Sequence, residues 1–342
     1  MAAPPLLLAL LRFVQGVGLG GEWDGAGLMA TQHAPRGRRG FYSSFPQTGP
    51  AVGFLLSSGL FLLLTLSLSG EQFALWGWRI PFLLSIVLVG IGLYVRATIA
   101  ETPVFRRAME NGTRAKVPFV DMVRAYPAVL ALTSGGIMLA YVLFYTITTF
   151  SLAYGTTELG LSRSTMLYCA MISVAVMGIA VPVFAALSDR TGRRRLCLLA
   201  ATLSALWAFP LFWLFDTGDP VLVALAFTAG MVIFAMLYGP MEAFLPELYG
   251  TRLRYSGASV SYNLGGVLGG AVAPLAATQL LASTRASWSI SLYVLAMSAV
   301  SFACVFLLSE THLIGLSAIR SGERRILAEV GTPATKAEGT PP

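Results

Sequence analysis

The chain has 342 residues, of which 56% are hydrophobic and only 11% are charged, and 23 basic against 16 acidic residues give a formal net charge of +7. Ordinary soluble domains carry roughly 25% charged residues, so this composition excludes a soluble globular protein and equally excludes a largely disordered chain. The composition therefore predicts a polytopic membrane protein.

Long apolar stretches recur along the whole chain and are separated by polar connections. A transmembrane helix needs about 20 mostly apolar residues, and the alternating pattern of membrane strands is absent from the sequence. We therefore predict an all-α polytopic fold with about nine transmembrane helices, embedded in the lipid bilayer of the cell membrane. The predicted spans are 5–30, 48–69, 80–99, 128–153, 166–187, 196–215, 220–246, 256–281 and 288–308.

The first predicted span, 5–30, carries unusual polar residues. At about 100° per residue, Arg12, Gln15 and Glu22 fall on one side of the helix, whereas Asp24 falls elsewhere. A charge at the bilayer centre costs about 2.5–3.5 kcal/mol on insertion scales, and such charges mark substrate or proton pathways. We interpret these residues as part of such a pathway. The alternative is that Glu22 and Asp24 lie near the lipid headgroups.

A long polar segment, 101–127, follows the third predicted span. It divides a three-helix part, 1–100, from a six-helix part, 128–312. Residues 313–342 form a polar tail that we expect to be disordered. Because transporters are commonly built from repeats of three helices, three plus six helices predicts a half-bundle that lacks one triplet.

Between the fifth and sixth spans the sequence reads LSDRTGRRR, at 187–195. Glycine permits a tight turn there, and aspartate–arginine pairs can latch two helices together in one conformation and release them in another. The alternative is a plain basic loop. The gate residues expected here are Asp189, Arg190, Gly192, Arg193 and Arg194.

The basic residues lie mainly in alternate connections. Nineteen arginines and lysines lie in or beside one set of connections and the C-terminal tail, against three in or beside the other set. The positive-inside rule therefore predicts a cytoplasmic C-terminus and, with nine spans, an outward N-terminus. The basic excess is explained by this topology, so we expect no nucleic-acid partner.

Cysteine and histidine are too few and too scattered for a metal or redox site. Cys169, Cys197 and Cys304 lie in three separate apolar stretches, and His33 and His312 are far apart. No pair has the spacing of metal ligands or of a redox motif. We therefore expect no metal, no cofactor and no enzymatic activity, and the motifs of intramembrane catalysis are absent from the sequence.

Several short segments carry a resemblance to a known family: RFVQG (12–16), GGEW (20–23), PRGRRGFY (35–42), GWRIPF (77–82), ETPVF (101–105), LSDRTGRR (187–194), PEL (246–248) and RLRYSGA (252–258). Taken together they resemble the major facilitator superfamily, and within it the metabolite:proton symporter group of proline/betaine, shikimate, citrate and 2-oxoglutarate carriers. The resemblance runs from about residue 6 to residue 312.

The resemblance also identifies where this chain departs from the pattern of the family. The family has twelve helices, and this chain begins at what resembles the fourth, so we expect an incomplete major-facilitator fold without the first copy of the gating loop. The missing helices would come from an upstream segment or from a second chain. Asp24 stands where the family usually has glycine.

The resemblance assigns roles as hypotheses. Arg12 would orient an anionic group or modulate a proton-binding acid, because a guanidinium stays charged. Glu22, Asp24 and Glu242 would be the candidate acids, with Glu242 surrounded by apolar residues. The alternative for Glu242 is a structural interhelical carboxylate. The candidate pathway residues are Arg12, Gln15, Glu22, Asp24, Tyr141, Tyr145, Glu242 and Asn263, with Gln279 a further cavity candidate, and Glu247, Arg252 and Arg254 would join the gate.

The leading functional prediction is proton-coupled symport of a small carboxylate or zwitterionic metabolite by alternating access. The alternative is a transport-inactive remnant, or half of a split carrier that needs a partner chain. A channel is disfavoured because the sequence contains no filter-like loop.

Overall fold

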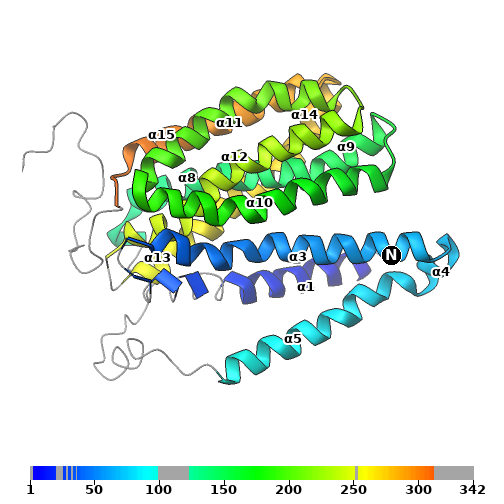
Figure 1. The fold of residues 1–342 in the computed structure, drawn as a ribbon, viewed down its shortest axis with the longest axis horizontal. Helices are drawn as coiled ribbons and strands as arrows, with labels where there is room; N and C mark the ends of the chain where they lie inside the picture. The colour runs from blue at the N-terminus through cyan, green and yellow to red at the C-terminus, as the bar shows by residue number, and fades with distance from the viewer. Residues whose placement is uncertain are drawn as a thin grey trace, which may run out of the picture.

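The computed structural model describes residues 3–20, 26–27, 30–31, 34–35, 37–98, 123–250 and 253–311. The regular elements in these ranges are all helices, which confirms the predicted all-α class (Figure 1). The N-terminal part contains α1 (Ala3–Gly20), α3 (Arg39–Ser67), α4 (Gly70–Leu75), the short η1 (Gly77–Arg79) and α5 (Ile80–Thr98). The C-terminal part contains α8 (Pro127–Tyr145), η2 (Thr146–Phe150), α9 (Ser151–Thr157), α10 (Arg163–Thr191), α11 (Arg193–Phe215), α12 (Pro220–Glu247), α13 (Arg254–Gly265), η3 (Gly266–Ala271), α14 (Val272–Thr284) and α15 (Trp288–Leu307).

Within the described ranges, eight helices are long and apolar enough to cross a membrane. They coincide with the second to ninth predicted spans, although several are longer than predicted at their ends. The first predicted span corresponds to α1, whose apolar portion is the shorter Leu6–Gly16, and its continuation lies partly outside the described residues. The count of about nine is therefore consistent with the structure.

Local chemistry sets several helix ends. The Ser162 hydroxyl accepts a hydrogen bond from the Thr165 amide at 3.1 Å and begins α10, and Asp219 accepts from the Val221 amide at 2.7 Å and begins α12. Side-chain oxygens at these positions satisfy amides that have no partner inside the helix. Gly192, with a φ of 102°, separates α10 from α11, because that conformation is unfavourable for any other residue.

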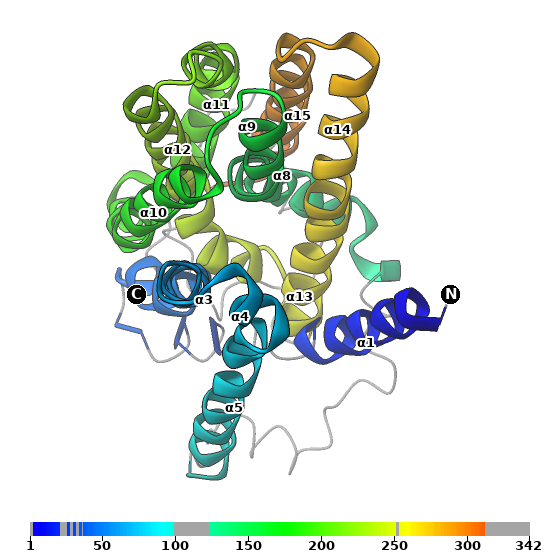
Figure 2. The same cartoon turned by 90° about the vertical axis from the view of Figure 1, so that its right-hand side faces the viewer.

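The six spans of the C-terminal part pack into one bundle (Figure 2). Helix α12 packs against α10 and α11, and α8 packs against α13 and α15. Large side chains such as Phe215 and Phe227 fill the interior, with ring centroids 5.0 Å apart. This bundle is the rigid body against which the N-terminal helices are placed.

Helices α3 and α5 differ in how they meet this bundle. Helix α3 lies along α10 and α12, whereas α5 leaves it at an angle and α1 stands to one side (Figures 1 and 2). All side chains of α5 from Phe82 to Val95 are exposed. The contact between the two parts of the chain is therefore made mainly through α3.

Candidate functional site

A cavity of about 210 Å³ lies between α3 and the six-helix bundle. Its wall is mainly aromatic, and it contains no acidic or basic side chain among its lining residues. Those residues are Pro50, Ala140, Tyr141, Phe144, Tyr145, Met177, Phe234, Tyr238, Tyr262 and Asn263. Because α3, α8, α10, α12 and α13 all contribute, the cavity belongs to the interface between the two parts of the chain.

Three residues predicted from the sequence, Tyr141, Tyr145 and Asn263, lie at this cavity. Sequence reasoning missed Phe234 and Tyr238 on α12, although aromatic residues four apart on a helix lie on one face and offered a signal. The binding role of all these residues stays a prediction.

Gln47 of α3 fixes one side of the interface next to the cavity. Its side chain is fully buried, and its amide nitrogen donates to the Tyr238 carbonyl at 3.4 Å and to the Tyr262 hydroxyl. The sequence does not predict this role, because a single glutamine in an apolar helix forms no recognisable motif. It ties α3 to both α12 and α13.

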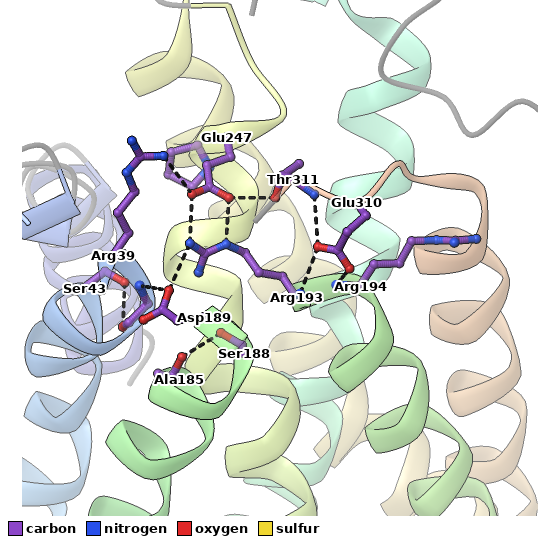
Figure 3. A network of polar contacts seen from close by, with 12 residues as sticks. Arg39, Ser43, Ala185, Ser188, Asp189, Arg193, Arg194, Glu247, Glu310 and Thr311 are labelled. Carbon is purple, nitrogen blue, oxygen red and sulfur yellow. Dashed lines mark hydrogen bonds and ion pairs between the residues drawn. The ribbon is translucent and has the colours of Figure 1, made fainter. Parts of the chain in front are cut away.

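At the Arg39 end of α3, four side chains form what we call the charged latch: Arg39, Asp189, Arg193 and Glu247 (Figure 3). The Arg193 Nε lies 2.7 Å from Glu247 Oε2, and its Nη2 donates to Glu247 Oε1 at 2.9 Å. Arg193 and Glu247 are only 1% and 2% exposed. The pair therefore combines one charge-assisted hydrogen bond, from Nη2, with a second close contact between nitrogen and oxygen.

The latch joins the two parts of the chain at two points. One is the Arg39 Nη1 of α3, which lies 3.9 Å from Glu247 Oε1 of α12. The other is Asp189 of α10, whose Oδ1 also lies 3.3 Å from the Arg193 Nη2 within the six-helix bundle. Asp189 also accepts hydrogen bonds from the Gly40 and Phe41 amides at 2.8 and 3.0 Å. Since these amides belong to the first turn of α3, Asp189 of α10 caps a helix of the other part.

Gly40 allows this contact. A Cβ atom at this position would lie 2.5 Å from the Ala185 carbonyl oxygen and 3.0 Å from Asp189 Oδ1. The helix α3 can therefore approach α10 closely only because position 40 has no side chain.

Glu310, just after α15, supports the latch and was missed by the sequence reasoning. Its carboxylate accepts from the amides of Arg193 and Arg194 at 2.9 and 3.1 Å, which caps α11. The neighbouring Thr311 hydroxyl donates to Glu247 Oε2 at 2.6 Å. These contacts hold the backbone of Arg193 and the second oxygen of Glu247 in place.

The other predicted gate residues have different positions. Arg194 reaches toward the end of α15, where its Nη2 donates to the Phe306 carbonyl at 2.5 Å, and Arg190 is exposed. The Arg254 Nε donates to the Pro246 carbonyl at 3.0 Å and so braces the turn between α12 and α13. Arg252 lies outside the described residues.

Arg12 and Gln15, the described polar residues of the first predicted span, are not among the residues that line the cavity. On α1, the Arg12 Nη1 donates to Gln15 Oε1 at 3.0 Å, and both side chains are exposed. Glu22 and Asp24 lie outside the described residues. A pathway role for these four residues stays a prediction.

Glu242 lies on α12 between the cavity residue Tyr238 and the latch residue Glu247. It is 1% exposed. Its carboxylate packs directly on the backbone of Gly27, because a Cβ atom there would lie 1.5 Å from Glu242 Oε1. A buried carboxyl group therefore faces the N-terminal part of the chain on the route from cavity to latch.

The described part of the chain contains no group of three or more histidine, cysteine, aspartate or glutamate side chains that could hold a metal ion. The three cysteines are unpaired, and Cys169 and Cys197 are buried. The chemistry available at the site is therefore that of ion pairs, hydrogen bonds and aromatic surfaces.

Comparison with known proteins places this geometry in a family. Residues 1–274 match the model of the Major Facilitator Superfamily. The chain is 42% identical over 313 residues to the inner membrane metabolite transport protein YhjE of Escherichia coli (strain K12), covering 90% of this chain and 71% of that protein. It is 33% identical to the shikimate transporter of the same organism, again covering 90% and 71%.

The fold is similar to the crystal structure of a D-xylose-proton symporter, with a TM-score of 0.57 and 18% sequence identity. The likeness covers 81% of this chain and 66% of that one, so the chain spans slightly less than two thirds of the solved structure. These relatives are transporters rather than enzymes, as the sequence predicts. The chain belongs to the Major Facilitator Superfamily.

Proposed function

We propose that this protein carries a small carboxylate or zwitterionic metabolite across the cell membrane together with protons, by alternating access. The observation that carries the proposal is the position of the cavity and the charged latch along one interface. A carrier needs two bodies that rock around a central site. Here α3 and the six-helix bundle meet around an aromatic cavity. At one end they are joined by the Arg39–Glu247 ion pair and by the cap that Asp189 places on α3.

The latch defines the conformational state that we assign to the structure. Arg193 and Glu247 of the latch are almost fully buried, so this end of the interface is closed. The distribution of basic residues supports a cytoplasmic position for the latch and the C-terminus, with the start of this chain outside. The state is then one in which the cytoplasmic path is shut.

Glu242 is the acid that we assign to proton coupling. It is buried between the cavity and the latch, on the face of α12 that contacts the N-terminal part. A carboxyl group can take up and release a proton, which proton coupling requires. Arg12 and Gln15 are proposed to meet the anionic end of the substrate in another arrangement of α1.

A second candidate is a carrier whose transport activity requires three further helices. Two observations favour it. The side chains of α5 from Phe82 to Val95 are exposed, and the alignment with the metabolite transport protein covers only 71% of that longer protein. Those helices would be supplied by a preceding segment of a longer protein or by a second chain. In their absence the protein would be inactive.

The test is uptake by purified protein in proteoliposomes under an inward proton gradient. Radiolabelled shikimate, proline and betaine represent the carboxylate and zwitterion classes. We expect uptake of at least one of them to collapse when the gradient is dissipated. Uptake that is unaffected by the gradient would contradict proton coupling, and no uptake in this chain but uptake in a version with three added helices would favour the second candidate.

The Glu242→Gln variant tests whether proton coupling can be lost while substrate binding and exchange remain. We expect this variant to lose gradient-driven uptake while keeping exchange of labelled for unlabelled substrate, because the amide cannot release a proton. Glu71→Gln, at an exposed position on α4, removes the same charge and serves as the control. Equal gradient-driven uptake in Glu242→Gln and wild type would remove Glu242 from the mechanism.

A further inference from the structure

Four glycines lie at the end of α13 and in η3, where they pack against α8 beside the cavity: Gly265, Gly266, Gly269 and Gly270. They divide into two pairs according to what an added side chain would meet. At Gly269 a Cβ atom would lie 2.3 Å from the Met138 carbonyl oxygen. At Gly265 it would lie 2.3 Å from Cγ2 of Ile137 and 3.0 Å from the Ser134 carbonyl oxygen. These two glycines therefore permit close contact between two backbones.

At Gly266 and Gly270 the atoms nearest to an added Cβ belong to tyrosine side chains. A Cβ atom at Gly266 would lie 3.3 Å from Cζ of Tyr141, and one at Gly270 would lie 2.8 Å from Cε2 of Tyr145. A ring at the end of a rotatable side chain can move away from such a contact, whereas a backbone cannot. Both rings line the cavity.

The backbone conformation is also unusual next to these glycines and tyrosines. Residues Gly266–Ala271 and Thr146–Phe150 each form a π-helical turn, and such turns are rare and frequently occur at functional sites. Tyr145 immediately precedes one of them, and Gly266 begins the other. The two π turns thus lie beside the two tyrosine rings.

We propose that Gly266 and Gly270 are specificity-determining positions: the absence of a side chain there lets the Tyr141 and Tyr145 rings stand back from the cavity and so sets the size of metabolite that it admits. The inference rests on the proposed function, in which this cavity holds the substrate. Alanine at either position displaces the facing ring toward the open space beside it, which is the cavity. The larger members of a substrate series are then excluded first.

The experiment measures cavity width without transport. Asn263, an exposed residue of the cavity wall, is replaced by cysteine as a reporter. Purified full chain is then labelled with aminoethyl methanethiosulfonate and, separately, with a bulky fluorophore-linked methanethiosulfonate. We expect Gly266→Ala and Gly270→Ala each to slow the bulky reagent about tenfold relative to the small one, the scale on which a pocket discriminates single methylene groups.

Three controls are needed to interpret the ratio of the labelling rates of the bulky and the small reagent. The chain without the reporter gives the background from its own cysteines. Gly53→Ala on α3, where an added Cβ meets nothing within 4 Å, must leave the ratio unchanged. Gly270→Ala combined with Tyr145→Leu must restore it, because the shorter side chain removes the displaced ring.

An unchanged ratio in both alanine variants would overturn the proposal, as would equal slowing of both reagents. If Gly270→Ala lowers the melting temperature, Gly266→Ala decides the question, since its contact is milder. Because labelling needs no transport, the proposal can fail while uptake succeeds, and a failure of uptake leaves this measurement intact.

Discussion

At the residue scale, Arg193 and Glu247 connect most of the features of the latch. Each is almost fully buried, and each has further partners that hold it in place: Glu310 at the backbone of Arg193, and Thr311 at the carboxylate of Glu247. A buried ion pair contributes little beyond a well-packed apolar pair, but removal of one partner costs roughly 3–5 kcal/mol. Because Glu247 also lies 3.9 Å from Arg39 of α3, the pair holds in place the carboxylate that the other part of the chain contacts.

The first prediction follows from this asymmetry. Glu247→Ala removes the carboxylate that Arg39 of α3 meets across the interface and leaves Arg193 with less compensation. The closed conformation therefore loses stability, and the latch end opens more often. Ser44→Cys, at a buried position of α3, reports the opening through its rate of labelling by a membrane-impermeant thiol reagent. We expect that rate to rise about tenfold or more, since 1.4 kcal/mol already corresponds to a factor of ten.

Arg190→Ala is the matched control for this measurement, because Arg190 is an exposed residue of the same loop. Its labelling rate should equal that of the parent. If Glu247→Ala leaves the rate unchanged, the latch does not hold this end closed.

The sequence shows the latch only in part. Asp189, Arg193 and Glu247 lie in recognisable motifs, and the structure brings them together. Glu310 and Gln47 have no comparable signal, because their partners lie far away in the chain and each is an ordinary residue at the end of, or inside, an apolar helix. The motif LSDRTGRRR at 187–195 also includes Arg194, which the structure places against α15. Local spacing cannot distinguish neighbouring arginines that point in different directions.

At the element scale, glycines determine how closely the helices pack. Helix α12 lies against α10 at Gly239, where a Cβ atom would be 2.6 Å from the Val181 carbonyl oxygen and 3.3 Å from the Ala185 amide nitrogen. Both neighbours are backbone atoms. Small residues at helix contacts in membranes allow this kind of close approach.

The second prediction concerns this contact. Gly239→Ala forces α10 and α12 apart, and overpacking of this kind costs about 1–3 kcal/mol. The melting temperature of the purified protein in detergent should fall. Gly49→Ala, where an added Cβ meets nothing within 4 Å, should leave it unchanged or raise it slightly. Equal melting temperatures for the two variants would show that the α10–α12 contact can relax without cost.

The elements themselves were largely predictable, and their placement was not. Spans such as Pro220–Glu247 are apolar over nearly their whole length, so hydropathy finds them. Such a helix has almost no polar face, and the pattern therefore does not say which side packs on which neighbour. The π-helical turns at Thr146–Phe150 and Gly266–Ala271 also lack a local signal, apart from the glycines of the second.

At the scale of the whole molecule, the two parts of the chain differ in how much of their surface meets protein. The six-helix bundle is packed on itself, whereas α5 exposes every side chain from Phe82 to Val95. The sequence predicts this asymmetry from the count of three spans before the central segment and six after it. Which molecules cover α5 in the cell is the question that separates the two candidate functions.

The third prediction addresses that question by mass spectrometry of the native protein, read beside the coding sequence upstream of Met1. A mass above 36.4 kDa, with three more apolar segments encoded in frame, would support a carrier with the additional helices in one chain. A native mass equal to 36.4 kDa would favour a second chain or an inactive protein. Co-purification of a separate three-helix protein would then distinguish these two.

The cap that Asp189 places on α3 has a consequence for the movement itself. The amides of Gly40 and Phe41 have their acceptor on a helix of the other body. When the two bodies separate, the first turn of α3 loses that acceptor and is free to fray into water. In the alternating-access mechanism that we propose, opening is then accompanied by a local helix–coil transition at the first turn of α3, which shortens this helix at the latch.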